Sequence, residues 1–198
     1  MSALAIKGLR IAFGGLVAVQ GLDLNVEQGS VHALIGPNGA GKTSLFHCIS
    51  GVLSTTSGQI QFKGQDITTW PENRRTYLGM GRTFQISSVF TDLTVLENIA
   101  LAQLGVGANK WGIWHPALQN PGLMDRAIAA LAQVGLVGKE DMAVKFMSYG
   151  ERRQLELVLA LINDPELLLL DEPCAGLSPA ERVRLAELIA ALPRHITM

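Results

Sequence analysis

The chain has 198 residues, enough for one large hydrophobic core or for a core with a smaller subdomain. Its composition is 48% hydrophobic and 17% charged. The formal net charge is −1, so the chain lacks the strong positive charge that favours binding to nucleic acid. No apolar stretch reaches the roughly 18 residues of a membrane-spanning helix, and the first residues lack the layout of a signal peptide. Cys48 and Cys174 form neither a metal-spaced pair nor a disulfide framework, so we expect a cytosolic protein.

The first part of the chain predicts strands in which apolar and polar residues alternate. Residues 4–12, 21–27 and 58–63 follow this period-two pattern, which indicates one buried and one wet face. Residues 31–35 are instead continuously apolar apart from one histidine. That pattern is typical of a short strand buried on both faces.

A glycine-rich segment follows this expected strand and precedes residues 44–50, which are apolar at helical spacing and end at Gly51 in a C-cap role. Its sequence fills every fixed position of the pattern G-x-x-x-x-G-K-S/T: Gly36, Pro37, Asn38, Gly39, Ala40, Gly41, Lys42 and Thr43. Glycines without a Cβ let the backbone approach a ligand, and successive N–H groups at a helix N-terminus form an anion site. Lys42 can reach the β- and γ-phosphates of a nucleotide, and Thr43 offers a hydroxyl to Mg²⁺. A tight turn without a ligand is the alternative, and the strand–turn–helix context favours the phosphate site.

The middle of the chain predicts helices that begin at capping boxes. Residues 69–72 have this pattern with Pro71 at the first helical position, and residues 94–97 open a helix to about residue 104. Residues 79–85 predict a short strand that leads into a loop, and residues 123–134 predict a helix that stops at Gly135. Because residues 86–147 contain no convincing strand, we expect an inserted helical subdomain in an α/β protein with a mainly parallel core sheet.

Two carboxylates follow the most apolar predicted strand, residues 167–170. Asp171 and Glu172 come directly after its end, where parallel sheets bind ligands. Asp171 can hold Mg²⁺ through water, and Glu172 can polarise the water that attacks the γ-phosphorus. A polar exit from an apolar strand is the alternative, which the complete phosphate loop makes less favourable. A capping box at residues 178–181 then opens the last helix, and residues 196–198 predict the start of one more strand.

A further capping box at residues 148–151 opens a helix to residue 162 and supports two interpretations. Glu151 reaching back to the backbone of Ser148 is an ordinary helix start. A serine at a helix N-terminus followed by Gly150 is also a second phosphate-binding end. Its position shortly before the acidic strand favours the second interpretation.

Together these segments resemble the nucleotide-binding subunits of ABC transporters. The phosphate loop, Gln85, residues 148–152 (Ser-Tyr-Gly-Glu-Arg) and residues 167–172 occur in the order found in that family. Residues 13–16, 81–85 and 93–98 look like the branch that serves branched-chain amino acid importers. The resemblance implies a P-loop NTPase core with a mainly parallel sheet, an antiparallel β subdomain and an inserted helical subdomain. The core would comprise residues 1–85 and 151–198, and the helical subdomain, which carries the signature motif, residues 86–150.

The resemblance also implies a role for each matching residue. Phe13 would stack on adenine, although an ordinary core aromatic is the alternative. Gln85 would contact Mg²⁺ or the attacking water and couple the site to the membrane partner, although a generic loop amide is the alternative. Ser148 and Gly150 would touch the γ-phosphate of an ATP molecule bound by the opposite subunit, with residues 175–178 across the dimer seam. The implied nucleotide-binding set is Phe13, Gly36, Pro37, Asn38, Gly39, Ala40, Gly41, Lys42, Thr43, Ser44, Ser148 and Gly150. The implied catalytic set is Glu172, Gln85 and Lys42, and the implied Mg²⁺ set is Thr43, Gln85 and Asp171.

The sequence departs from the broad superfamily in the signature and in the seam loop. Met147, Tyr149 and Glu151 stand where Leu, Gly and Gln are favoured, and Ser178 stands where Asp is common.

A second departure concerns the switch histidine that follows the strand after the last helix in this family. His195 precedes that strand, so we expect a C-terminally incomplete chain that binds nucleotide and hydrolyses it poorly. In the helical insert, Trp111 and Trp114 predict a packed aromatic pair or a contact surface for the membrane subunit.

The function implied is that of the ATP-hydrolysing subunit of a bacterial importer for branched-chain or related amino acids, at the cytoplasmic face of the inner membrane. Its partners would be a second ATPase subunit, identical or paralogous, the transmembrane permease subunits and, indirectly, a periplasmic solute-binding protein, with no nucleic acid. The alternatives are a non-transport ABC ATPase and a truncated module that binds nucleotide with little turnover.

Overall fold

A computed structural model of the chain describes residues 2–83, 89–106 and 121–198. The chain divides into two compact units. The first unit comprises Met1–Arg82, Glu166–Asp171 and Pro193–Met198, and the second comprises Thr83–Pro165 and Glu172–Leu192. These units are groups of packed residues, so the expected division into residues 1–85 with 151–198 and residues 86–150 stays a prediction.

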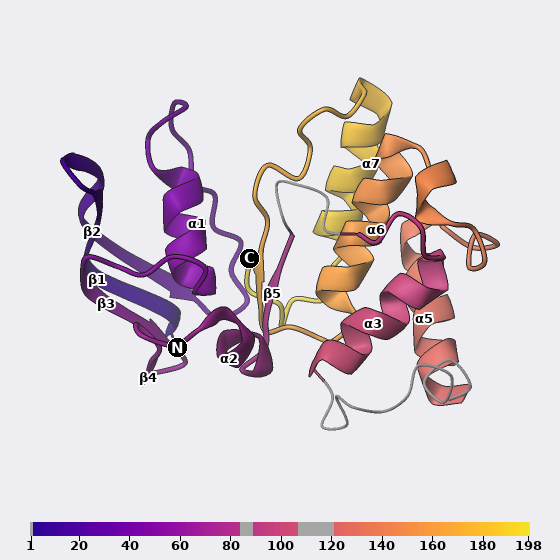
Figure 1. Ribbon diagram of the computed structural model, residues 1–198, viewed down its shortest axis with the longest axis horizontal. Helices are drawn as coiled ribbons and strands as arrows, with labels where there is room; N and C mark the ends of the chain where they lie inside the picture. The colour runs from indigo at the N-terminus through magenta and orange to yellow at the C-terminus, as the bar shows by residue number, and fades with distance from the viewer. Residues whose placement is uncertain (1, 84–88, 107–120) are drawn as a thin grey trace. The chain divides into compact units, whose positions relative to one another are not determined.

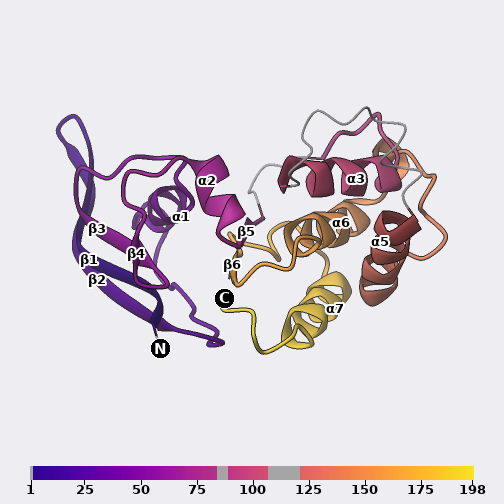
Figure 2. The same ribbon diagram turned by 90° about the horizontal axis from the view of Figure 1, so that it is seen from below.

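The first unit contains a four-stranded antiparallel sheet in the order β2-β1-β3-β4. β1 (Ser2–Phe13) and β2 (Leu16–Glu27) form a long hairpin, β3 (Ser57–Phe62) pairs with β1, and β4 (Gln65–Asp66) pairs with β3. α1 (Lys42–Ser50) lies against one face of this sheet (Figures 1 and 2). The alternating pattern predicts one apolar face for these strands, and that face packs on α1 to form the core of the unit. The core residues of β1 and β3 are Leu4, Ile6, Leu9, Ile11, Ile60 and Phe62, and those of α1 are Leu45, Cys48 and Ile49.

The end of α1 is fixed by a buried arginine of α2 (Glu72–Tyr77). Gly51 ends α1 in the left-handed conformation with φ 86°, as the sequence predicts. Arg75, only 2% exposed, donates hydrogen bonds to four backbone carbonyl oxygens, those of Cys48, Ile49, Thr68 and Trp70, at 2.7–3.0 Å. A guanidinium cation is well suited to this place because the last carbonyl groups of a helix carry partial negative charge.

The capping box predicted at residues 69–72 is wrong. Pro71 itself is the N-cap of α2, with φ −70° and ψ 160°, and no side chain caps the helix. The extended backbone at Pro71 moves the helix start to Glu72, so Thr69 lies too far upstream to accept from the first turn.

The parallel part of the first unit consists of β5 (Met80–Arg82) and β6 (Leu167–Leu169). Residue 197 forms a parallel bridge with Leu167, which agrees with the strand start predicted at residues 196–198. The Met198 N–H donates to the Ser30 carbonyl oxygen at 3.0 Å, and the His32 N–H donates to that of Met198 at 2.7 Å. Residues 30–32 therefore pair alongside this group of strands.

The prediction of a buried strand at residues 31–35, which lie within the described range 2–83, is wrong. The segment has no strand assignment, and Val31 and Ile35 are 70% and 94% exposed. The described backbone pairing stops at His32. Beyond it Leu34 is half-buried and packs against the core of this unit, whereas Ile35 stays exposed.

The second unit is a group of helices around α6 (Tyr149–Leu161), as Figure 2 shows. The others are α3 (Val95–Val106), α5 (Pro121–Val134), α7 (Pro179–Ala190) and a short 3-10 helix, η1 (Val144–Phe146). Apolar side chains that recur at helical spacing form its core: Val95, Ile99, Leu131, Val134, Leu155 and Val158. Trp111 and Trp114 lie outside the described residues. Within the described ranges, no helix combines the length and apolar character needed to cross a membrane.

Candidate functional site

The phosphate loop of the first unit is a turn that only glycine can form at two positions. Gly39 and Gly41 have φ 82° and 85°, in the left-handed region where a Cβ is disfavoured. A Cβ on Gly41 would also lie 2.5 Å from the carbonyl oxygen of Ala18 and 2.9 Å from a methyl group of Val19. The glycines therefore let the loop turn into α1 while it is pressed against β2.

The start of α1 carries an uncompensated positive field. α1 begins at Lys42, directly after Gly41, and has no acidic residue in its first turn. The free N–H groups of that turn and the helix dipole therefore favour an anion. The ammonium group of Lys42 donates to the carbonyl oxygens of Gly36 and Pro37, at 2.7 and 2.9 Å, so the side chain lies back along the loop. Residues 36–40 are exposed, so the loop is accessible to a ligand.

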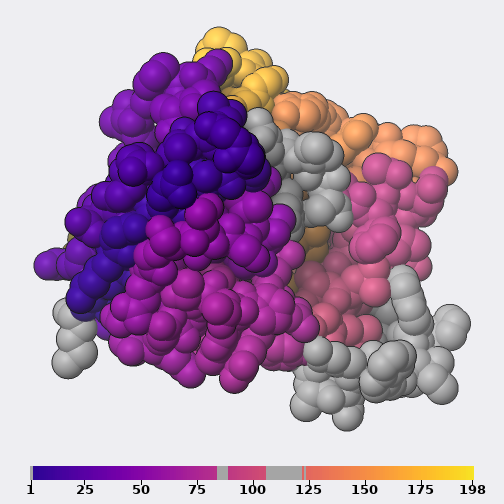
Figure 3. Space-filling model, turned by 60° about the vertical axis from the view of Figure 1, so that its left-hand side comes forward, coloured from indigo at the N-terminus to yellow at the C-terminus, as the bar shows by residue number. Residues whose placement is uncertain are grey.

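Phe13 lies at the end of the hairpin that supports the loop. It pairs with Leu16 across the β1–β2 turn, and its side chain is 47% exposed. Ala18 and Val19 of the same hairpin contact Gly41, roughly 7–10 Å further along the strand at about 3.3 Å per residue. Figure 3 shows the indigo hairpin at the surface of this unit. An exposed aromatic at this place fits an adenine platform better than the core aromatic considered as its alternative.

Asp171 is a buried carboxylate at the end of β6, and it faces a buried arginine. Its Oδ2 lies 3.9 Å from Nη2 of Arg82, and the two side chains are 5% and 6% exposed. Nη1 of Arg82 donates to the hydroxyl of Ser50 at 2.6 Å, which ties this pair to the last turn of α1. Burial lowers the pKa of Arg82, and the charge of Asp171 partly restores it. The same surroundings reach His47 of α1, whose pKa is lowered by burial and by Arg82 and raised by Asp171.

Arg82 was not among the residues expected at the site. The available signal was its place at the end of a strand, three residues before Gln85. Gln85 itself lies outside the described residues, so its expected contacts stay a prediction.

The residues present fit a magnesium ion. Oδ2 of Asp171 is buried and makes no hydrogen bond, so this oxygen retains a free acceptor position. Within the described ranges, no cluster of three or more His, Cys, Asp or Glu side chains gathers to hold a metal. Mg²⁺ does not require one, because it keeps several waters and binds through one or two protein oxygens and the phosphates of its nucleotide. Thr43 and Asp171 supply oxygens of that kind, both in the first unit.

Glu172 begins the loop of the second unit that follows β6. Its φ is 48°, an uncommon left-handed conformation for a residue with a Cβ, and its side chain is exposed. The Glu172 carbonyl oxygen accepts from the N–H of Ala175 at 3.0 Å, which closes a tight turn. Strained backbone of this kind persists where the surroundings impose it, often at functional sites.

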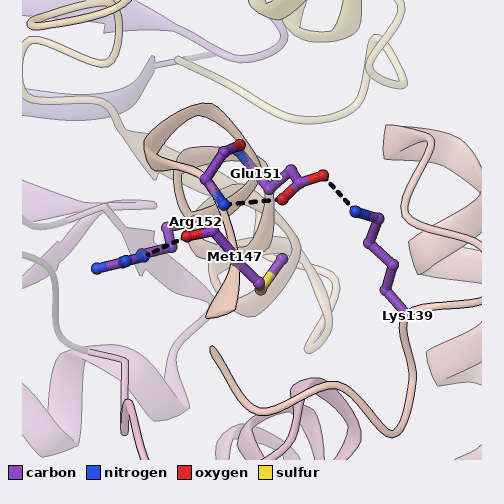
Figure 4. Close-up of polar contacts among 5 residues, drawn as sticks. Lys139, Met147, Glu151 and Arg152 are labelled. Atoms are coloured by element: carbon purple, nitrogen blue, oxygen red, sulfur yellow. Dashed lines mark hydrogen bonds and ion pairs between the residues drawn. The ribbon is translucent and has the colours of Figure 1, made fainter. Parts of the chain in front are cut away.

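The signature segment starts α6 with the predicted capping box. The Glu151 N–H donates to the Ser148 hydroxyl at 3.3 Å, and the Ser148 N–H donates to the Glu151 carboxylate at 2.8 Å. Figure 4 shows the same carboxylate reaching the ammonium group of Lys139. The hydrogen bond from Lys139, followed by the one from the Ser148 backbone, holds the pKa of Glu151 below its usual value. Met147 is buried, and its carbonyl oxygen accepts from Nε of Arg152 at 3.1 Å (Figure 4).

Ser148 and Gly150 line a cavity of about 190 Å³ within the second unit. The Glu181 carboxylate, held by the capping box of α7, lies so close to Gly150 that a Cβ there would collide with it. The cavity is lined by Ser148, Gly150, Glu151, Gln154, Leu177, Glu181, Arg184 and Leu185. The structure thus groups Ser148 and Gly150 with Glu172 in the second unit, and the phosphate loop, Phe13 and Asp171 in the first.

Comparisons with known proteins show which family and which solved structures the chain resembles. The family model described as ABC transporter matches residues 19–175. The high-affinity branched-chain amino acid transport ATP-binding protein LivG of Salmonella typhimurium is 37% identical over 199 residues, which is 97% of this chain and 77% of that protein. The phosphonates import ATP-binding protein PhnC 2 of a Synechococcus strain is 38% identical over 180 residues, 90% of this chain and 66% of that protein. The solved structure of MJ1267, an ATP-binding cassette of an ABC transporter, superposes with a TM-score of 0.86 at 26% identity and covers 100% of this chain and 79% of that one.

Proposed function

The chain belongs to the ABC transporter family as its ATP-hydrolysing domain, and from this premise we propose that it energises the import of branched-chain or related amino acids. A relative named for branched-chain amino acid transport aligns over nearly the whole chain. Residues 13–16, 81–85 and 93–98 support the same branch. Because a relative named for phosphonate import is as similar over a shorter stretch, the solute must be decided by experiment.

The phosphate loop is the observation that carries the proposal. The N–H groups of residues 38–44 surround the β-phosphate, and Lys42 leaves its two carbonyl partners to meet the β- and γ-phosphates. The exchange is favourable because two neutral acceptors are replaced by phosphate oxygens that carry full charge. Phe13 stacks on the adenine ring, and the phosphate loop recognises the triphosphate.

Hydrolysis follows from the two carboxylates after β6. When bound, Mg²⁺ would neutralise charge between the β- and γ-phosphates. Thr43 and Asp171 would hold it, Asp171 through water. Glu172 accepts the proton of the water that attacks the γ-phosphorus, and its carboxylate is exposed and accessible to that water. Gln85 orients the same water.

Transport requires partners, and the second unit supplies the surface for one of them. Ser148 and Gly150 lie at the positive end of α6 and contact the γ-phosphate held by an opposing ATPase subunit, identical or paralogous. Residues 175–178 lie along the same seam. Binding of ATP closes this pair, and hydrolysis opens it and moves the permease subunits at the cytoplasmic face of the membrane. A periplasmic solute-binding protein then selects the solute.

Nucleotide binding is tested by calorimetry with Mg-ATP on the wild-type chain, Lys42→Ala and Lys63→Ala. Lys63 is a matched control, because it is a half-exposed lysine of the same unit that pairs with Glu166. We expect Lys42→Ala to weaken binding at least about tenfold, which corresponds to 1.4 kcal/mol, and Lys63→Ala to leave it unchanged. Absence of binding by the wild-type chain, or equal binding by both variants, would refute the proposal.

The solute is tested in vesicles. Permease subunits that co-purify with the chain are reconstituted with it, their solute-binding protein and enclosed or external ATP, and uptake of labelled leucine and methylphosphonate is measured. The proposal expects ATP-dependent leucine uptake that is lost with Lys42→Ala. Uptake of methylphosphonate alone would assign the chain to a different import branch.

A further inference from the structure

Tyr149 stands where the broad superfamily favours glycine, and it links two segments of the second unit. Its hydroxyl donates a hydrogen bond to the carbonyl oxygen of Ala175 at 3.1 Å. The same hydroxyl accepts from Nε and Nη2 of Arg153, at 3.1 and 2.9 Å. One oxygen on the first turn of α6 therefore uses its donor and both acceptor positions, and its donor goes to the loop that follows Glu172.

The ring of Tyr149 also shapes that loop by contact. Gly176 has φ 76°, and a Cβ there would lie 3.1–3.3 Å from three atoms of the tyrosine ring and hydroxyl. The loop backbone thus lies directly on the aromatic ring. A larger residue at position 176 would have to move either the ring or the loop.

Arg153 holds the tyrosine from the other side. Its Nη1 donates to Glu156 at 2.7 Å, and the two side chains are 9% and 5% exposed. The guanidinium carbon lies 5.3 Å from the centre of the Tyr149 ring. Because this ion pair is buried within α6, it gives the hydroxyl a rigid support rather than a mobile surface partner.

The bond from Tyr149 acts on the turn that begins at the catalytic carboxylate. The N–H of Ala175 donates to the carbonyl oxygen of Glu172, and the carbonyl oxygen of Ala175 accepts from Tyr149. The N–H of Ala175 therefore closes the turn at Glu172, and its carbonyl oxygen fastens the turn to α6. Glu172 is the residue with φ 48°, so its conformation depends on this turn.

We propose that Tyr149 is a positioning residue that fastens the loop of residues 172–177 to the start of α6, so that the signature residues Ser148 and Gly150 and the backbone of Glu172 move as one body. The coupling itself is a property of the isolated chain, and its effect on turnover rests on the proposed function.

The coupling is tested without nucleotide by amide hydrogen exchange of the segment 172–178. Tyr149→Phe keeps the ring against Gly176 and removes only the hydroxyl, and Tyr77→Phe in the first unit is the matched control. The net contribution of one hydrogen bond predicts about 3- to 10-fold faster exchange in this segment of Tyr149→Phe, with unchanged exchange in α5 and no change in Tyr77→Phe. Equal exchange in Tyr149→Phe and the wild type would overturn the inference.

Turnover provides the second measurement. We expect Tyr149→Phe to lower kcat for Mg-ATP by about 3- to 10-fold with KM unchanged, because the phosphate loop is intact and only the group that acts on water is displaced. A change in KM alone contradicts the positioning role. If no variant binds ATP, the proposed function fails while the exchange result still decides the coupling. If the wild-type chain hydrolyses ATP but Tyr149→Phe shows the same hydrogen exchange as the wild type, the coupling fails and the proposed function stands.

Discussion

Replacing Arg75 by methionine tests whether a buried cation, rather than apolar packing, holds the phosphate-loop helix in place. Its guanidinium donates four hydrogen bonds to backbone carbonyl oxygens, two of them at the C-terminal end of α1. Hydrogen bonds to charged groups contribute about 1.5–3 kcal/mol each, so four contribute roughly 6–12 kcal/mol. Removing the cation from water costs several kcal/mol, and a net loss of roughly 3–5 kcal/mol remains on substitution.

The assay needs a probe of the first unit alone, because the two units need not unfold together. In a Trp111→Phe, Trp114→Phe background, Trp70 is the single tryptophan, and its carbonyl oxygen is one of the four acceptors. Urea unfolding followed by its fluorescence should give the expected loss, and the midpoint of thermal unfolding should fall by roughly 6–20 °C at about 2–4 °C per kcal/mol. Arg10→Met is the control, since Arg10 bonds one side chain at the sheet surface and should cost less than about 0.5 kcal/mol.

A free energy of unfolding for Arg75→Met within about 1 kcal/mol of the parent, with an unchanged urea dependence, would refute the reasoning. It would mean that the carbonyl groups at the end of α1 find water or that the methionine packing compensates fully. A large loss in Arg10→Met as well would show that the effect is not specific to the buried cation.

Two further predictions concern groups whose pKa the fold displaces. Glu151→Gln keeps the capping box and loses the pair with Lys139, so we expect a loss of about 1 kcal/mol at pH 7. Because the folded pKa of Glu151 is lowered, that stability is present above its unfolded pKa of about 4.3 and is lost as the pH falls through the folded value. Urea midpoints of the two proteins should therefore converge as the pH falls through the folded pKa of Glu151, and a constant gap would contradict the assignment. Burial raises the pKa of Cys48 to about 11, so in Cys174→Ala the remaining thiol should react with an aromatic disulfide at pH 8 only on unfolding, and rapid labelling of the folded chain would exclude this.

The parts of the fold that the sequence predicted correctly are those encoded within a few residues. The capping boxes at residues 148–151 and 178–181 form as expected, because a serine and a glutamate three residues apart satisfy each other's backbone without help from the rest of the chain. Gly41 and Gly51 bound α1 for an equally local reason, since only glycine takes their positive φ without strain. The phosphate loop was therefore predictable from its own sequence.

The errors come from features that depend on distant segments. Residues 31–35 have the apolar pattern of a buried strand, but burial requires a neighbour on each side, and the described pairing ends at His32. Arg75 and Arg82 look like surface residues in the sequence. Arg75 is buried because backbone carbonyl oxygens accept its hydrogen bonds, and Arg82 is buried beside the carboxylate of Asp171. The pattern of apolar residues in the sequence does not indicate such partners. The same limit applies to Tyr149, whose departure from the family was visible but whose partner Ala175 lies 26 positions away.

The structure around the two carboxylates after β6 supports their predicted role without reference to any motif. Asp171 is buried with one oxygen that makes no hydrogen bond, which costs about 1–3 kcal/mol beside an arginine at 3.9 Å. Glu172, the next residue, holds a left-handed φ that costs a similar amount. A glycine in place of Glu172 would adopt the same φ without strain, and a carboxylate with all its oxygens hydrogen-bonded would serve Arg82 better than Asp171 does. Two consecutive unfavourable choices fit the prediction that Asp171 keeps an oxygen for a hydrated cation and that Glu172 activates the attacking water, and this argument does not depend on the phosphate loop.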